Sequence, residues 1–181
     1  SLITEKTKAI VLVHYAGMVC DLDEFHKIGK EFNIPIIEDA AHALGSKYNG
    51  KLTGCNSDYT VYSLQAIKHM TTVDVGFLEM KDDLKMDRAK RLRRFGLSKD
   101  KSRLDNYITE VGFKYAIYNF NATICKVQMQ YVAQNIDKYI SNGKFYDEAL
   151  KGIPDVDLVT YNKNPDPSYW LDSMKVAYRN G

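Results

Sequence analysis

A strand–helix–strand pattern within the first forty residues limits the fold more than any other feature of the sequence. Ala9–His14 (AIVLVH) is a short apolar run rich in β-branched residues, as expected of a strand buried on both faces. Asp21–Phe32 follows with apolar residues at helical spacing, and Asp21 is the expected N-cap. Ile34–Glu38 is a second apolar run. This order predicts a βαβ unit, and therefore a parallel sheet.

The same reasoning extends the α/β pattern through the rest of the chain. Two further strands are expected at Thr60–Leu64 and Gly76–Met80. Helices are expected at Asp82–Phe95, Ala122–Ile140 and Gly143–Lys151, and a final strand at Tyr169–Tyr178.

Composition argues against several classes of function. The chain has 181 residues, 45% of them hydrophobic and 27% charged, with a net charge of +2. This balance is that of a soluble globular protein and favours neither nucleic acid nor a membrane as partner. The basic run Arg88–Arg94 (RAKRLRR) is expected to be a solvated helix face. No signal segment or membrane-spanning run is predicted.

The three cysteines indicate the compartment. Cys20, Cys55 and Cys125 are widely separated and odd in number, so they suit neither a disulfide framework nor a metal site. We expect a reducing cytoplasm and no metal.

Polar residues follow the predicted strands, where ligands bind in parallel α/β sheets. Asp39 and His42 follow the strand at Ile34–Glu38, Ser63 and Lys68 lie at or after the next strand, and His14 ends the first. Each has a simpler explanation. Asp39 would cap a turn, His42 would be a partly buried histidine, and Lys68 alone would be a solvated charge.

Taken together, these residues match the needs of a pyridoxal phosphate site. A lysine forms the Schiff base, an acid pairs with the pyridinium nitrogen, and hydroxyl and amide groups hold the phosphate. Neither the dinucleotide fingerprint GxGxxG nor a GxxxxGK[ST] loop is present in the sequence.

Five segments occur in an order that resembles the DegT/DnrJ-type sugar aminotransferases, which are pyridoxal-phosphate enzymes with the aspartate aminotransferase fold. They are EDAAHALGSKYNGKLTG (38–54), YSLQAIKHMTT (62–72), RLRRFG (91–96), VGFKY (111–115) and NATI (121–124). The resemblance implies part of the large domain of a fold-type I transferase, with a mixed, mostly parallel sheet flanked by helices. Residues 1–121 would belong to that domain. Residues 122–181 would form a connecting helix and the start of a smaller C-terminal α+β domain.

The resemblance also implies roles for single residues. Lys68 would form the Schiff base, and Asp39 would pair with the pyridinium nitrogen. His42 would lie near the cofactor's 3′-oxygen. The phosphate would be bound by Ser63, by Gln65 and, in the neighbouring subunit's site, by Lys114.

The reaction implied by the resemblance is transamination of a nucleotide-linked keto-deoxysugar, with glutamate as donor, by a homodimer with shared active sites. A dehydrating branch of the family has histidine in place of the lysine, so Lys68 argues against that branch.

Two departures from the family pattern matter. Relatives extend further at both ends, so this chain alone is expected to be inactive. Val73 and Val75 stand where glycines are common, and a left-handed backbone at either valine would be strained. The alternative function is therefore a non-catalytic descendant that serves as a dimerisation or regulatory module.

Overall fold

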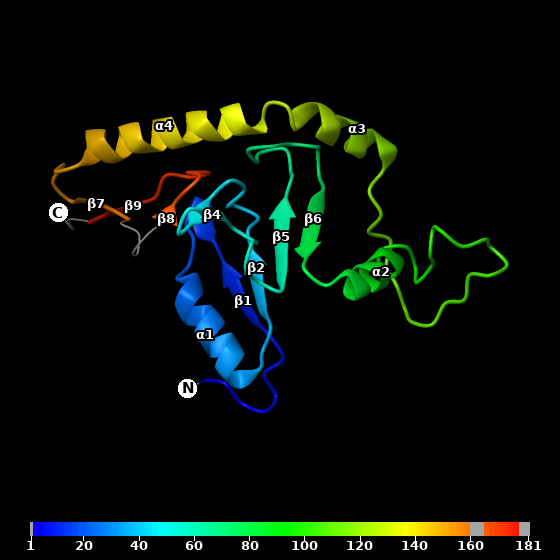
Figure 1. Ribbon diagram of the computed structural model, residues 1–181. Coiled ribbons are helices and arrows are strands. Elements are labelled where there is room, and N and C mark those ends of the chain that lie inside the picture. Colours follow the sequence, from blue (N-terminus) through cyan, green and yellow to red (C-terminus); the bar gives the residue numbers. More distant parts are fainter. Residues whose placement is uncertain (1, 160–164, 178–181) are drawn as a thin grey trace.

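The centre of the molecule is a four-stranded sheet with the order β1-β2-β5-β6 (Figure 1). The computed structural model describes residues 2–159 and 165–177. Strands β1, β2 and β5 are parallel, and β6 is antiparallel to β5. The four strands are Ile10–Val13, Ile36–Asp39, Tyr59–Ser63 and Gly76–Met80. The mixed, mostly parallel sheet predicted from the sequence is thereby confirmed.

Helix α1 (Leu22–Phe32) connects β1 to β2 and completes the predicted βαβ unit. Asp21 is its N-cap, accepting a hydrogen bond from the backbone N–H of Glu24 at 3.4 Å. Leu12, Leu22 and Ile36 form a buried core between this helix and the sheet, together with Val19 and Tyr48.

The prediction that the first strand is buried on both faces is wrong for the described residues. Leu12 is buried, but Val11 and Val13 on the opposite face of β1 are 59% and 53% exposed. Side chains alternate between the two faces of a strand, and α1 covers only the face that carries Leu12. The other face of β1 is therefore open.

Short elements lie near the upper end of the sheet and beyond it. A 3₁₀ turn, η1 (Tyr15–Gly17), follows β1. Two small antiparallel sheets have the orders β4-β3-β8 and β7-β9. Their strands are Lys47–Tyr48 (β3), Lys51–Leu52 (β4), Val156–Leu158 (β7), Pro165–Asp166 (β8) and Met174–Val176 (β9).

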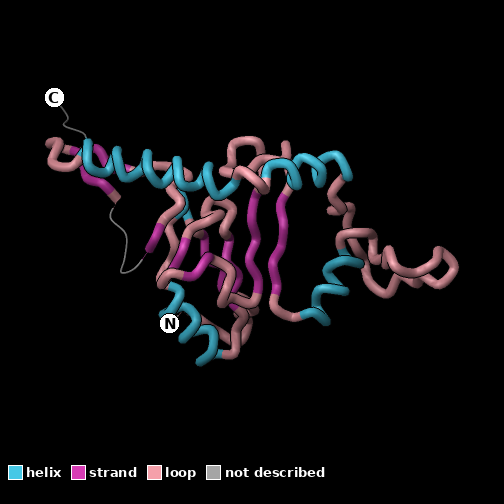
Figure 2. The backbone as a smooth tube through the Cα atoms, turned by 45° about the horizontal axis from the view of Figure 1, so that its top comes forward, coloured by secondary structure: helices cyan, strands magenta, loops and turns pink. Residues whose placement is uncertain are grey.

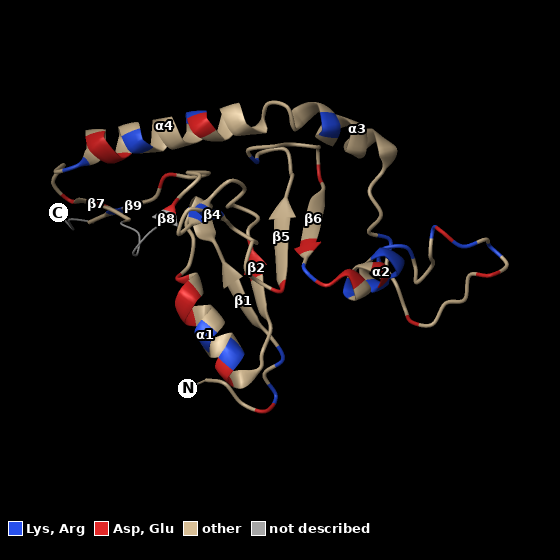
Figure 3. Cartoon of the chain, in the orientation of Figure 1, with Lys and Arg blue, Asp and Glu red and all other residues tan. Residues whose placement is uncertain are grey.

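Helix α2 (Asp83–Leu92) begins one residue after Asp82, whose carboxylate caps it by accepting from Leu84 N–H at 3.0 Å. Figure 3 shows basic residues gathered on this helix. Arg88 forms an ion pair with Glu110 at 2.9 Å, and Arg91 lies 4.0 Å from the same carboxylate. The long loop after α2 extends away from the sheet (Figures 1 and 2).

Helices α3 (Asn119–Gln128) and α4 (Val132–Leu150) run along the end of the sheet toward which β5 points (Figure 1). The prediction of a single helix over Ala122–Ile140 is wrong, because residues 129–131 separate two helices. The Gln130 side-chain amide donates to the carbonyl of Val127 at 3.0 Å and satisfies one of the last carbonyls of α3. Helix α4 then continues through Gly143, where a new helix was expected.

The strand expected at Tyr169–Tyr178 is reduced to β9. Tyr169 has a left-handed backbone with φ of 48°, which is incompatible with an extended strand at that position. Tyr178 lies outside the described residues. Among the described residues, no helix combines the length and apolar character needed to cross a membrane.

Candidate active site

Two predicted site residues lie at the carboxyl ends of neighbouring parallel strands. Asp39 is the last residue of β2 and Ser63 is the last residue of β5. The Asp39 carboxylate accepts a hydrogen bond from the backbone N–H of Ala41 at 3.1 Å. This bond forms the predicted turn and also fixes the orientation of the carboxylate.

Lys68 follows β5 through a tight turn. The Gln65 N–H donates to Ser63 Oγ at 3.4 Å, and the Lys68 N–H donates to Gln65 O at 2.9 Å. Burial lowers the pKa of Lys68, and the negative charge of Asp39 opposes that shift. A lysine with a lowered pKa has a larger neutral fraction, which is the form that attacks a carbonyl.

His42 lies within electrostatic range of Lys68 and Asp39. Burial lowers the pKa of His42, the charge of Lys68 lowers it further, and Asp39 acts in the opposite direction. The backbone N–H of Ala16 points at His42 Nδ1 at 3.4 Å. Because Nδ1 accepts, the ring proton of the neutral imidazole lies on Nε2, which is free to donate to a ligand oxygen.

Trp170 also belongs to this group, and sequence reasoning missed it. The Lys68 Nζ lies 3.7 Å from the centre of the indole ring, and the His42 ring lies 3.9 Å from the same ring. The ring of Tyr15 meets the His42 ring edge-on, with 5.6 Å between the ring centres. The one available signal was that Trp170 is the only tryptophan in the sequence.

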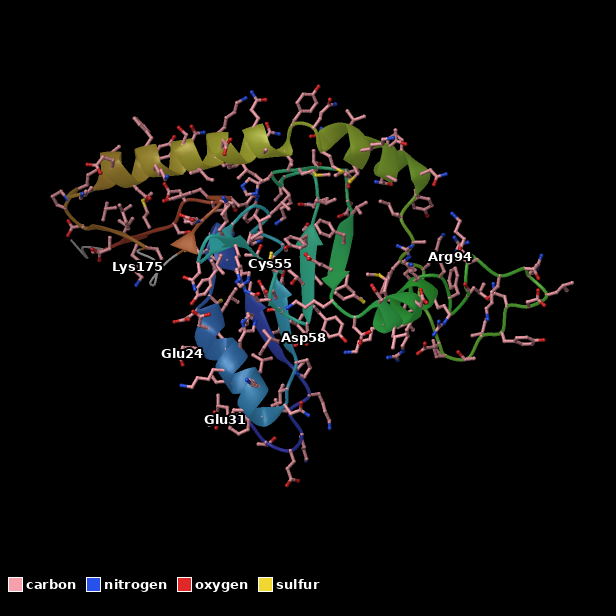
Figure 4. All side chains as sticks on the ribbon, in the orientation of Figure 1. Glu24, Glu31, Cys55, Asp58, Arg94 and Lys175 are labelled. Atoms are coloured by element: carbon pink, nitrogen blue, oxygen red, sulfur yellow. The ribbon has the colours of Figure 1, made fainter. Side chains whose placement is uncertain are left out.

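The structure does not bring Lys114 into this group. Its backbone pairs with Arg94 in an isolated bridge, and its ammonium lies 5.9 Å from the Tyr118 ring. Figure 4 places Arg94 beside α2, on the side of the sheet away from α1. The predicted role of Lys114 in a neighbouring subunit's site stays a prediction.

The two valines after Lys68 behave differently. Val73 has φ of 78°, in the left-handed region that a β-branched side chain strongly disfavours, whereas Val75 is outside that region. The strain anticipated from the sequence is therefore present, and it is confined to Val73.

His14, the third candidate at a strand end, is structural. It is completely buried, and its Nε2 lies 2.8 Å from Oε2 of the equally buried Glu38. It has no route to a ligand in the described part of the chain.

The sequence matches the DegT/DnrJ/EryC1/StrS aminotransferase family over residues 1–180. A UDP-4-amino-4-deoxy-L-arabinose–oxoglutarate aminotransferase from Shewanella sediminis is 35% identical over 159 residues, which are 84% of this chain and 41% of that protein.

Solved structures agree with the sequence comparison. AtS13 from Actinomadura melliaura has a TM-score of 0.92 at 31% identity, covering 97% of this chain and 49% of its own. PseC from Helicobacter pylori, an aminotransferase involved in the biosynthesis of pseudoaminic acid, has a TM-score of 0.90 at 26% identity. That match covers 97% of this chain and 47% of PseC. The chain thus spans less than half the length of these proteins.

The fold and the group of residues at the strand ends define the class as the pyridoxal-phosphate-dependent transferases of α/β architecture. The chain belongs to the DegT/DnrJ/EryC1/StrS aminotransferase family, whose members depend on pyridoxal 5′-phosphate.

The donor set fits that cofactor. When the cofactor is bound, Lys68 would offer an amine with a lowered pKa, Asp39 an oriented carboxylate for the ring nitrogen, and His42 an Nε2–H for a ring oxygen. Ser63, at the end of β5, and Gln65, two residues later, would offer a hydroxyl and an amide for the phosphate.

Proposed function

We propose that this chain forms the lysine-bearing part of an aminotransferase that acts on a nucleotide-linked keto-deoxysugar, with glutamate as amino donor. The observation that carries the proposal is the Lys68 amine, which lies over the Trp170 ring at 3.7 Å, within electrostatic range of the Asp39 carboxylate, with its pKa lowered by burial. The proposed products are amino sugars for polysaccharide or O-antigen biosynthesis. An amino-sugar product is supported by the name of the Shewanella relative, a UDP-4-amino-4-deoxy-L-arabinose–oxoglutarate aminotransferase.

Each residue has a defined task in this proposal. When bound, pyridoxal 5′-phosphate supplies an electron sink for the bond that breaks next to the substrate nitrogen. Lys68 holds the cofactor and, once freed, moves a proton at the reacting substrate carbon through Nζ. Asp39 keeps the ring nitrogen protonated, because its negative charge favours the charged form. His42 orients the ring through Nε2–H.

We also propose a homodimer in which Lys114 serves the neighbouring subunit's phosphate as a point charge. Many large apolar side chains between α2 and α3 are exposed, and a patch of this kind is typical of a protein interface. They include Leu104, Tyr107, Ile108, Val111, Phe113, Tyr115 and Tyr118. Residues beyond this chain and the partner subunit would both be needed for activity, so the chain alone would be inactive.

The cytoplasm is the proposed compartment. All three cysteines are free thiols, which is the usual state of cysteines in a reducing environment.

The experiment is to add pyridoxal 5′-phosphate to the protein at its natural length and to reduce the product with borohydride. We expect a yellow protein and, by peptide mass spectrometry, cofactor fixed on Lys68. Lys68→Ala should abolish the colour, whereas Lys27→Ala, a change at an exposed lysine of α1, should leave it unchanged. A colourless natural-length protein would contradict the proposal.

A second candidate function, a dimerisation or regulatory module without catalysis, is favoured by one observation. The strained backbone at Val73 lies close to Lys68 in the sequence and is a feature of the same loop. A folded dimer that binds no cofactor would support this alternative. Tight binding with turnover of a nucleotide-linked keto sugar would exclude it.

A further inference from the structure

The residues on both sides of Lys68 are held by one distant segment of the chain. Trp170 Nε1–H donates to the carbonyl of Ile67 at 3.0 Å. The ring of His69 is buried, and its Nε2 lies 3.0 Å from the carbonyl of Ser168, to which it donates. These two hydrogen bonds thus hold the chain on both sides of Lys68, at Ile67 and at His69.

The same segment is anchored to the loops beyond β1 and β2. Ser168 is completely buried, and its N–H donates to Ser46 Oγ at 3.0 Å. Ser46 Oγ in turn donates to the carbonyl of Gly17 at 2.6 Å. Leu171 N–H donates to the carbonyl of Ala16 at 3.3 Å. We call residues 168–171 the clamp segment.

The clamp segment places the indole of Trp170 between two site residues. Lys68 Nζ lies over the ring at 3.7 Å, and the imidazole of His42 lies against the ring at 3.9 Å with an interplanar angle of 33°. An ammonium over an indole face is attracted by the ring quadrupole, and the Nε1–H bond and the imidazole restrict how the indole can turn. The amine therefore has a preferred location.

We propose that Trp170 is a positioning residue for Lys68, and that docking of the clamp segment completes the lysine site. What Lys68 does there rests on the proposed function, but the contact itself does not. Trp170 holds the ammonium form of Lys68 within electrostatic range of Asp39, the last residue of β2.

A leucine at position 170 would preserve an apolar neighbour and remove the π face, whereas a phenylalanine would preserve a π face. Both changes remove the hydrogen bond to Ile67, so their comparison isolates the ring. Loss of the cation–π attraction destabilises the ammonium, so Trp170→Leu should lower the pKa of Lys68, and Trp170→Phe should lower it less.

The other charged and titratable groups around Lys68 are Asp39, His42 and His69. Asp39 is the opposing charge, and the pKa values of His42 and His69 are both lowered by burial, so both rings are neutral when Lys68 loses its proton.

The test uses cofactor-free protein of natural length and competitive acetylation with trace acetic anhydride over a pH series, with mass spectrometry at each lysine. We expect the Lys68 midpoint in Trp170→Leu to fall by about half a pH unit or more. It should fall less in Trp170→Phe, and the profile of exposed Lys27 should stay unchanged. Equal shifts in both variants, or no shift in Trp170→Leu, would overturn the proposal.

A second measurement follows the fluorescence of Trp170 during a pH titration of protein that keeps the tryptophan. The Trp170 emission, isolated by subtracting the Trp170→Phe spectrum, should change with pH at the midpoint found for Lys68 by acetylation. Lys68→Met should abolish that transition, and its persistence in Lys68→Met would refute the contact.

The two proposals fail separately. If borohydride fixes no cofactor on Lys68 but the titrations behave as described, the proposed function fails and the positioning role of Trp170 stands.

Discussion

The imidazole of His14, the residue that follows β1, and the carboxylate of Glu38 in β2 are both completely buried and lie 2.8 Å apart. The Gly54 N–H donates to the same carboxylate oxygen at 3.1 Å. Burial lowers the pKa of His14, but hydrogen bonds to the side chains of Cys20 and Glu38 outweigh that effect and raise it to about 9. The pKa of Glu38 is lowered: burial acts to raise it, and the bonds to His14 and Ser57 prevail.

This pair predicts a stability that falls in mildly alkaline solution. The pKa of His14 is higher in the folded state than the ordinary 6.5, so its contribution is complete below about pH 6.5 and is lost as the pH rises toward 9. The loss should be about 3 kcal/mol. Glu38 acts in acidic solution. Its contribution to stability is lost as the pH falls below 4.5, the ordinary pKa of a glutamate.

Urea unfolding of the natural-length protein at a series of pH values measures this effect. His14→Gln should flatten the profile between pH 6.5 and 9 and should lower stability by about 3 kcal/mol or more at pH 6, because it leaves a buried carboxylate without its ionic partner. Glu24→Gln, at an exposed carboxylate on α1 (Figure 4), is the matched control and should change neither. A flat wild-type profile would show that the pair does not titrate as described.

Val73→Gly should stabilise the protein. The left-handed backbone at Val73 costs about 1–2 kcal/mol, and a glycine relieves it while losing about 0.5–1 kcal/mol of chain entropy on folding. The net gain should reach about 1 kcal/mol, measured as a higher Tm. Val75→Gly is the control, since Val75 is outside the left-handed region and should lose stability. A lower Tm for Val73→Gly would show that this φ carries no strain.

Gly143→Ala should destabilise the protein although alanine is the better helix former. The added methyl would overlap the ring of Tyr169, which packs directly on Gly143 in α4. The helix gains about 1 kcal/mol, but overpacking costs about 1–3 kcal/mol and displaces the clamp segment. We therefore expect a lower Tm together with a change in Trp170 emission.

Asn142→Ala, at an exposed position one residue earlier in α4, provides the comparison for this prediction. It should raise the Tm slightly and leave the emission unchanged. Unchanged emission in Gly143→Ala would mean that Tyr169 and Trp170 move independently.

The sequence by itself determined the elements whose signals are local. Apolar runs and helical spacing predicted β1, α1 and β2 and their parallel pairing, because a βαβ unit follows from short-range pattern. Asp39, His42 and Lys68 were found for the same reason, since each follows a recognisable strand. Strain at Val73 or Val75 was also anticipated, because both stand where glycines are common in the family that the sequence resembles.

Only the tertiary structure decided which distant groups meet. Nothing in the periodicity around Trp170 indicates that its indole lies against Lys68, because that contact depends on hydrogen bonds to Ile67 and Ser168 that close a loop of about a hundred residues. The exposed outer face of β1 was missed because a run of apolar residues reports burial on average, and the alternation of side chains shows its effect only once the covering elements are known. Local pattern was sufficient for β1, α1 and β2, whereas long-range packing decides the surroundings of the lysine.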